Sequence, residues 1–181
     1  MNLKLIPLLL CGVALMGCAG NRSEKAEQVA AEAAFTQGQV AAGRFLLTVY
    51  SRVQKPGAPA TVYVEGDGRA YSGYRPTSDP TPTDPVALRL AGADGAANVI
   101  WLARPCQYSG LVSGEACPSD YWTGKRFAPE VIAAMNAALD ALKQRHGVTG
   151  LHLVGFSGGA AVAVLVAAER SVVASLRTVA G

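Results

Sequence analysis

Apolar residues along the chain occur in short runs and in longer periodic stretches, which predict different elements. Short runs rich in β-branched and aromatic residues, bounded by turn residues, predict strands at 45–51, 61–64, 98–103, 151–155 and 176–180. Apolar positions at helical spacing predict helices near 86–90, from Pro129 to Gly147, and over 159–169, the last apolar on every side and therefore buried. This alternation indicates an α/β fold with a mostly parallel sheet, an antiparallel start, and helices on both faces.

The first residues have the layout of a secretory signal peptide. Lys4 precedes an almost unbroken apolar stretch that ends at Met16 and is too short to span a membrane permanently. The run Leu15-Met16-Gly17-Cys18 resembles the bacterial lipobox, which implies cleavage before Cys18 and lipidation of that cysteine. We therefore expect a periplasm-facing protein anchored in a bacterial cell envelope, and the absence of Asp directly after Cys18 favours the outer membrane. The alternative is an ordinary signal peptide with a coincidental cysteine.

Composition divides the chain into three parts. Residues 1–17 form the predicted signal peptide, and residues 18–42, rich in Ala, Glu, Gln and Lys, predict a lipid anchor followed by a polar, partly helical tether. Residues 43–181 contain the predicted strands and helices of one α/β domain. The formal net charge of +3 at pH 7 is small and gives no support to a nucleic-acid partner.

Two of the four cysteines fall within the predicted domain, because Cys11 and Cys18 belong to the N-terminal segment. An exported protein meets an oxidising compartment, so Cys106 and Cys117 are expected to form a disulfide. Closing a loop of this length contributes about 2–3 kcal/mol on the chain-entropy argument. Metal binding is the weaker alternative, because no histidine or second Cys-x-x-Cys stands nearby. No metal or cofactor is implied elsewhere.

The run 151–160 places Ser157 between glycines, where a predicted strand passes into a predicted helix. Such a Gly-x-Ser-x-Gly turn, the nucleophile elbow, holds a serine oxygen rigid and exposed. Gly155 and Gly159 leave room for the bend, and the Gly158 amide at the helix N-terminus can face a developing oxyanion. The alternative is a glycine-rich turn without chemistry.

On these residues, the chain over 45–181 resembles the α/β-hydrolase superfamily. The stretches 84–90, 103–108 and 127–130 are similar to those of uncharacterised bacterial hydrolases that carry lipoprotein signals. The resemblance implies that Ser157 is the nucleophile and that Gly158 is one oxyanion donor. The second donor would be the backbone N–H of Asp67, in a turn where Glu65-Gly66 replaces the His-Gly of many relatives. The Asp67 carboxylate, repulsive to an oxyanion, should turn away or be paired.

The resemblance also implies a catalytic acid and then a histidine after the serine, and this sequence has neither in place. His146 and His152 both precede Ser157, and they are expected to serve as a helix cap and as a core residue. Glu169, the only acidic residue beyond Ser157, belongs to the following helix. We therefore expect a hydrolase domain truncated after the sixth of the usual eight strands, its C-terminal part missing, with little activity by itself.

The predicted function is an exported serine hydrolase that acts on a small-molecule ester, thioester or amide through an acyl-enzyme. The alternative is a non-catalytic binding lipoprotein of the same fold. Loop aromatics can either line a pocket for an acyl or aryl group or anchor their loops, and the sequence favours neither role for Tyr71, Tyr74, Tyr108, Tyr121 and Trp122.

Overall fold

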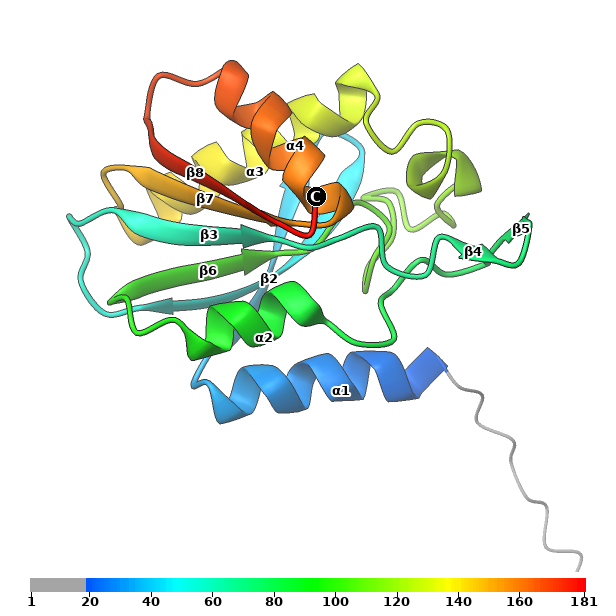
Figure 1. The fold of residues 1–181 in the computed structure, drawn as a ribbon, viewed down its shortest axis with the longest axis horizontal. Coiled ribbons are helices and arrows are strands. Elements are labelled where there is room, and N and C mark those ends of the chain that lie inside the picture. Colours follow the sequence, from blue (N-terminus) through cyan, green and yellow to red (C-terminus); the bar gives the residue numbers. More distant parts are fainter. Residues whose placement is uncertain (1–18) are drawn as a thin grey trace, which may run out of the picture.

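The computed structural model describes residues 19–181, so Cys18 and its predicted lipidation lie outside the described residues. A six-stranded sheet forms the centre, in the order β1-β2-β6-β3-β7-β8 (Figure 1). Strands β1 and β2 and strands β2 and β6 pair antiparallel, and the remaining neighbours pair parallel. The strands are β1 (Thr36–Ala42), β2 (Phe45–Val53), β3 (Ala60–Val64), β6 (Asn98–Leu102), β7 (Leu151–Phe156) and β8 (Val173–Val179). The predicted parallel sheet with an antiparallel start is confirmed.

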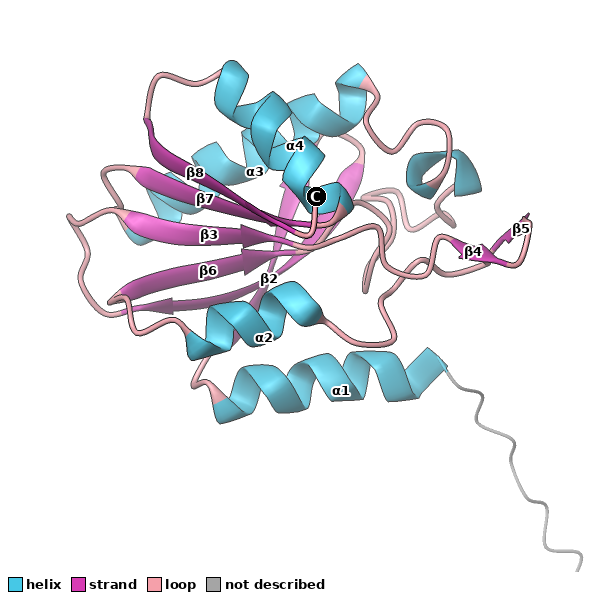
Figure 2. Cartoon of the chain, viewed as in Figure 1, coloured by secondary structure: helices cyan, strands magenta, loops and turns pink. Residues whose placement is uncertain are grey.

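Helices cover both faces of the sheet (Figure 2). On one face, α3 (Pro129–His146) and α4 (Gly158–Ala168) pack into the larger apolar core. On the other, α1 (Ala19–Glu32) and α2 (Val86–Ala93) pack over Trp101 and Tyr50. The helix α3 begins at Pro129 and ends before Gly147, whose φ of 62° provides the left-handed stop that favours glycine. Smaller elements are β4 (Tyr71–Ser72), β5 (Arg75–Pro76) and a 3₁₀ helix (Ser119–Trp122).

The predicted tether over 18–42 is wrong where the structure describes it. Residues of α1 at helical spacing, Ala26 and Ala30, are buried against the sheet face, and Thr36–Ala42 pairs with β2 along its whole length. Alanine is only weakly hydrophobic, so a helix face made of alanines gives a weak amphipathic pattern in the sequence. In the structure, these alanines nevertheless pack against aromatic side chains of the sheet. The folded domain therefore begins before residue 43.

The prediction that the last helix is buried all round is also wrong. Val164 and Leu165 of α4 are 45% and 41% exposed, and Leu176 and Val179 of β8 are similarly exposed. One side of α4 packs on β7 and β8, whereas nothing among residues 19–181 covers its other side. Within this part of the chain, β8 is an edge strand with apolar neighbours, an arrangement that favours association.

The Cys106–Cys117 disulfide is present and closes the loop between β6 and α3. Cys106 is buried, and it joins the same apolar core as Leu111, Tyr121 and Trp122. The bridge therefore attaches the loop to the core at the end of the sheet where the parallel strands finish.

Candidate active site

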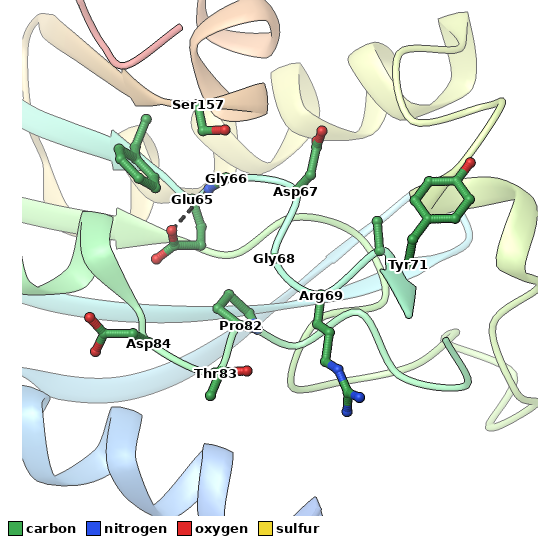
Figure 3. A pocket seen from close by; sticks show the side chains of 12 residues that line it. Glu65, Gly66, Asp67, Gly68, Arg69, Tyr71, Pro82, Thr83, Asp84 and Ser157 are labelled. Atoms are coloured by element: carbon green, nitrogen blue, oxygen red, sulfur yellow. Dashed lines mark hydrogen bonds between the residues drawn. The ribbon is translucent and has the colours of Figure 1, made fainter. Parts of the chain in front are cut away.

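Ser157 lies at the turn between β7 and α4, with φ of 51° and ψ of −124°. A non-glycine residue in this region carries about 1–3 kcal/mol of strain, so the surroundings must hold it there. The Ser157 N–H donates to the Val179 carbonyl at 2.8 Å, and its carbonyl accepts from the Ala160 N–H at 2.8 Å. The side chain is only half-buried and faces a pocket (Figure 3). The structure thus has the tight strand-to-helix bend that the motif predicts.

The two outer glycines of the motif are required by close backbone packing. A Cβ on Gly155 would lie 2.7 Å from the Ala160 nitrogen, and a Cβ on Gly159 would lie 2.5 Å from the Val64 carbonyl oxygen. These distances are well below van der Waals contact. The glycines therefore allow β7, the start of α4 and the end of β3 to meet at one point.

The loop that follows β3 is held by the buried carboxylate of Glu65. Its Oε1 accepts the N–H of Gly66 at 2.9 Å and that of Ala87, at the start of α2, at 3.4 Å, and its Oε2 accepts the Trp101 indole N–H at 3.1 Å. The Gly66 carbonyl in turn accepts from the Gln107 amide at 2.8 Å. Sequence reasoning missed this role, although a carboxylate directly after an apolar strand and before a glycine was its signal.

The amides of Asp67 and Gly158 donate no hydrogen bond to any residue in the described part of the chain. Both belong to segments that line or border the pocket beside Ser157. Neither amide is therefore committed to a partner within residues 19–181, and the oxyanion assignment stays a prediction.

The Asp67 carboxylate is paired, as expected. Its Oδ1 lies 3.2 Å from Nη1 of Arg104, and its Oδ2 lies 3.4 Å from Nε of Arg126. Arg104 is buried, and burial lowers its pKa to about 10 although Asp67 opposes the shift. The carboxylate packs on Gly158, where a Cβ would lie 2.6 Å from Asp67 Oδ2. The two guanidinium groups and the one carboxylate thus give a net positive charge next to the proposed oxyanion site.

The pocket has a volume of about 470 Å³ and opens between the ends of β3 and β7 and the segments 68–71 and 82–84. The aromatic residues divide between the two roles left open above. Tyr71 lines this pocket, whereas Tyr121 and Trp122 are buried in the core and anchor their loop. Tyr108 packs edge-on against Trp101, and Tyr74 is fully exposed.

Solved structures share the fold of this chain at low sequence identity. An Agrobacterium tumefaciens protein of unknown function, assigned to the α/β hydrolases, matches 79% of the chain with a TM-score of 0.56 and 13% identity. A serine hydrolase homologue from Coxiella burnetii matches 79% with a TM-score of 0.53 and 16% identity. A candidate lipase from Acinetobacter baumannii matches 87% with a TM-score of 0.56 and 16% identity.

The chain has the α/β-hydrolase fold. It spans 59%, 61% and 45% of the length of these three structures. No family model and no curated protein matches the sequence. The α/β-hydrolase fold is therefore established by structure, while the chemistry depends on the residues of this chain.

Neither histidine is placed as an α/β-hydrolase base. His152 is the second residue of β7 and lies near the end of the strand that is remote from Ser157. The five positions between them correspond to about 16 Å along the strand. Its Nδ1 lies 2.8 Å from the Ser175 hydroxyl. His146 is the last residue of α3, and burial lowers its pKa, with Arg145 adding to the effect. Glu169 accepts from the Asn136 side chain at 2.6 Å. Within residues 19–181, neither histidine nor Glu169 therefore lies beside Ser157.

Two other features are absent from the same residues. No group of three or more His, Cys, Asp or Glu side chains within 19–181 is arranged to hold a metal ion. None of the helices described there combines the length and apolar character needed to cross a membrane.

Replacing Glu65 by glutamine is expected to change how stability depends on pH. Burial raises the pKa of Glu65 above its ordinary value of 4.5, although its hydrogen bonds oppose the shift. The folded chain therefore binds this proton more tightly than the unfolded chain, so the contribution of Glu65 to stability falls as pH rises above about 4.5. Urea unfolding between pH 4 and 7 should show this decline in the wild type but not in Glu65→Gln. The exposed Glu115→Gln serves as the control and should follow the wild type; an identical profile in all three proteins would contradict the assignment.

Proposed function

We propose that this chain carries the nucleophile and oxyanion hole of an exported serine hydrolase acting on carboxylic esters. The observation that carries the proposal is the strained φ of Ser157, held beside a pocket next to two unbonded backbone amides. A strained conformation of this kind persists only where the surroundings enforce it, and such residues cluster at functional sites. Structural neighbours described as lipases and serine hydrolases support the reaction class by analogy of fold.

In this mechanism, the Ser157 Oγ attacks the carbonyl carbon of the ester while a general base takes its proton. The oxyanion of the tetrahedral intermediate accepts hydrogen bonds from the N–H groups of Gly158 and Asp67. Its collapse expels the alcohol and leaves an acyl-enzyme, which water then hydrolyses. Neither described histidine reaches Ser157, so residues 19–181 place no histidine base beside it. The 181-residue chain alone should then turn over esters slowly.

The location is part of the proposal. We place the protein in a bacterial envelope, anchored by lipid on Cys18, on the strength of the signal-peptide and lipobox resemblance of residues 1–18. Mass spectrometry of Cys18 in the membrane fraction tests this, and an unmodified cysteine would contradict it.

Ser157 should react with a fluorophosphonate probe, slowly in buffer and faster as imidazole is added. Imidazole can supply the missing general base, so the labelling rate of the 181-residue chain should rise with its concentration. Ser157→Ala should remove the label from the chain, whereas Ser175→Ala, which alters a serine bonded to His152, should leave it. Peptide mapping identifies the labelled residue. Labelling that is unaffected by Ser157→Ala, or no labelling at any imidazole concentration, would refute the catalytic role.

A second candidate is a binding lipoprotein that uses the same pocket without chemistry. The separation of both histidines from Ser157 favours it. Saturable binding of short-chain esters, without acylation of Ser157 and without their hydrolysis, would support this function instead.

A further inference from the structure

A small hairpin at the rim of the pocket presents aromatic and cationic side chains to solvent. Strand β4 pairs antiparallel with β5 through a turn at Gly73, and the hairpin extends away from the body of the molecule (Figure 1). Tyr74 is fully exposed and Tyr71 is 49% exposed, although tyrosine rings are usually at least partly covered. The segment 69–71, at the base of the hairpin, lines the pocket that contains Ser157.

The hairpin also carries positive charge that no neighbouring group neutralises. Arg69 and Arg75 are exposed, and neither forms an ion pair with any residue of the described part of the chain. The carboxylates nearby are already occupied: Asp67 pairs with Arg104 and Arg126, Asp79 with Arg22, and Asp84 with Lys25 and Arg89. An anionic surface would therefore meet two free arginines here.

The start of helix α1 lies at the same end of the molecule as the hairpin. Arg22 pairs with Asp79 at 2.8 Å and donates to the Thr81 carbonyl at 2.7 Å, while Lys25 pairs with Asp84 at 2.9 Å. These contacts attach the first turns of α1 to the segment 79–84, part of which lines the pocket. The start of α1 and the hairpin thus lie at one end of the molecule (Figure 1), and the segments 69–71 and 82–84 at this end line the pocket.

We propose that the β4–β5 hairpin contacts the surface of an anionic phospholipid bilayer. Tyr71 and Tyr74 would enter the headgroup region, where an apolar ring and a polar hydroxyl are both accommodated, and Arg69 and Arg75 would meet the phosphates. The pocket would then open at the membrane surface. On the proposed hydrolase function, on which this last step rests, the substrate is an acyl ester presented by or dissolved in the bilayer.

Fluorescence quenching in vesicles tests the contact independently of catalysis. The full 181-residue chain, carrying Ser72→Cys with an attached fluorophore, is reconstituted into phosphatidylglycerol–phosphatidylethanolamine vesicles that contain a lipid with a nitroxide near its headgroup. Cys106 and Cys117 are held in a disulfide, and wild-type protein labelled in parallel measures the signal from Cys11 and Cys18, which is subtracted. The fluorophore at position 72 should be strongly quenched. The same fluorophore on Lys55→Cys, in the turn before β3 at the end of the molecule opposite the hairpin, should not be quenched.

Charge variants test which residues make the contact. A basic residue at an anionic membrane surface contributes about a fivefold preference for the bound state. Arg69→Gln with Arg75→Gln should therefore lower the ratio of docked to undocked hairpin, measured at position 72, by about 25-fold. The matched pair Lys55→Gln with Lys143→Gln removes two charges from the end of the molecule opposite the hairpin. This pair should leave the ratio of docked to undocked hairpin unchanged. Equal quenching at positions 72 and 55, or quenching at 72 that persists in neutral phosphatidylcholine vesicles, would overturn the proposal. Fluorophosphonate labelling of Ser157 tests the hydrolase proposal, and quenching in vesicles tests the membrane contact. The two proposals can therefore fail separately.

Discussion

Gly159→Ala is expected to destabilise the folded chain by about 3 kcal/mol, because the added methyl group cannot be accommodated by movement of a side chain. Its Cβ would lie 2.5 Å from the Val64 carbonyl oxygen and 2.9 Å from the Glu65 carbonyl carbon, both of them backbone atoms. Relief requires α4 to move away from the end of β3, which would also shift Ser157 and the Glu65–Gly68 loop. Chemical denaturation monitored by the fluorescence of the buried Trp101 and Trp122 measures the loss.

Gly95→Ala provides the matched control. Gly95 has no atom within 4 Å of the position that a Cβ would take, so this substitution should change the free energy of unfolding by no more than about 0.5 kcal/mol. A loss for Gly159→Ala no larger than that for Gly95→Ala would show that the helix and the strand end are not in the close contact described.

Asp67→Asn should cost about 3 kcal/mol of stability, because it leaves the Arg104 guanidinium buried without its carboxylate. The Arg104 side chain is 5% exposed and its Nε has no hydrogen-bond partner within residues 19–181, so water cannot readily replace the lost charge. The Arg126 carbonyl, which accepts from Nη2 at 2.6 Å, would be its main remaining partner. Urea unfolding at neutral pH measures the effect.

The control for this substitution is Asp120→Asn. Asp120 pairs with Lys125 at the surface, where both side chains are more than half exposed, and such pairs contribute about 0–1 kcal/mol. Equal losses for the two variants would mean that the Asp67–Arg104 pair behaves as a surface pair. The same variants separate stability from chemistry, because Asp67 donates to the proposed oxyanion through its backbone and not through its carboxylate.

Local signals predicted the central part of the fold and the elbow. Apolar runs placed β2, β3, β6 and β7 within two residues of their observed bounds, because strands that are covered on both faces of the sheet need apolar side chains on both faces. The Gly-x-Ser-x-Gly spacing identified the bend, since the glycine at 155 is required by its contact with Ala160 within the same turn. Both features depend on contacts between residues that are close in sequence or similar in chemistry.

Other features depend on contacts that the sequence does not mark. The Asp67 carboxylate meets Arg104 from 37 positions away, and nothing local to Asp67 indicates which of the arginines will reach it. The sequence of strand β1 and helix α1 predicts a tether because the buried residues of both elements are largely alanine, with a single valine. Glu65 was assigned no role because a charged side chain within the core is costly unless several donors converge on it, and those donors come from two other elements.

The hydrogen bond from the Ser157 N–H to the Val179 carbonyl joins the reactive bend to the outermost strand of the described sheet. Outer strands fray more readily than inner ones, because half of their backbone groups exchange with water. Opening of β8 would release one of the restraints that keep the serine in its unfavourable backbone geometry, whereas any strand that annealed to β8 would tighten it. The backbone geometry of Ser157, and with it the proposed readiness of its hydroxyl for attack, is therefore set partly by what happens at the border of the sheet.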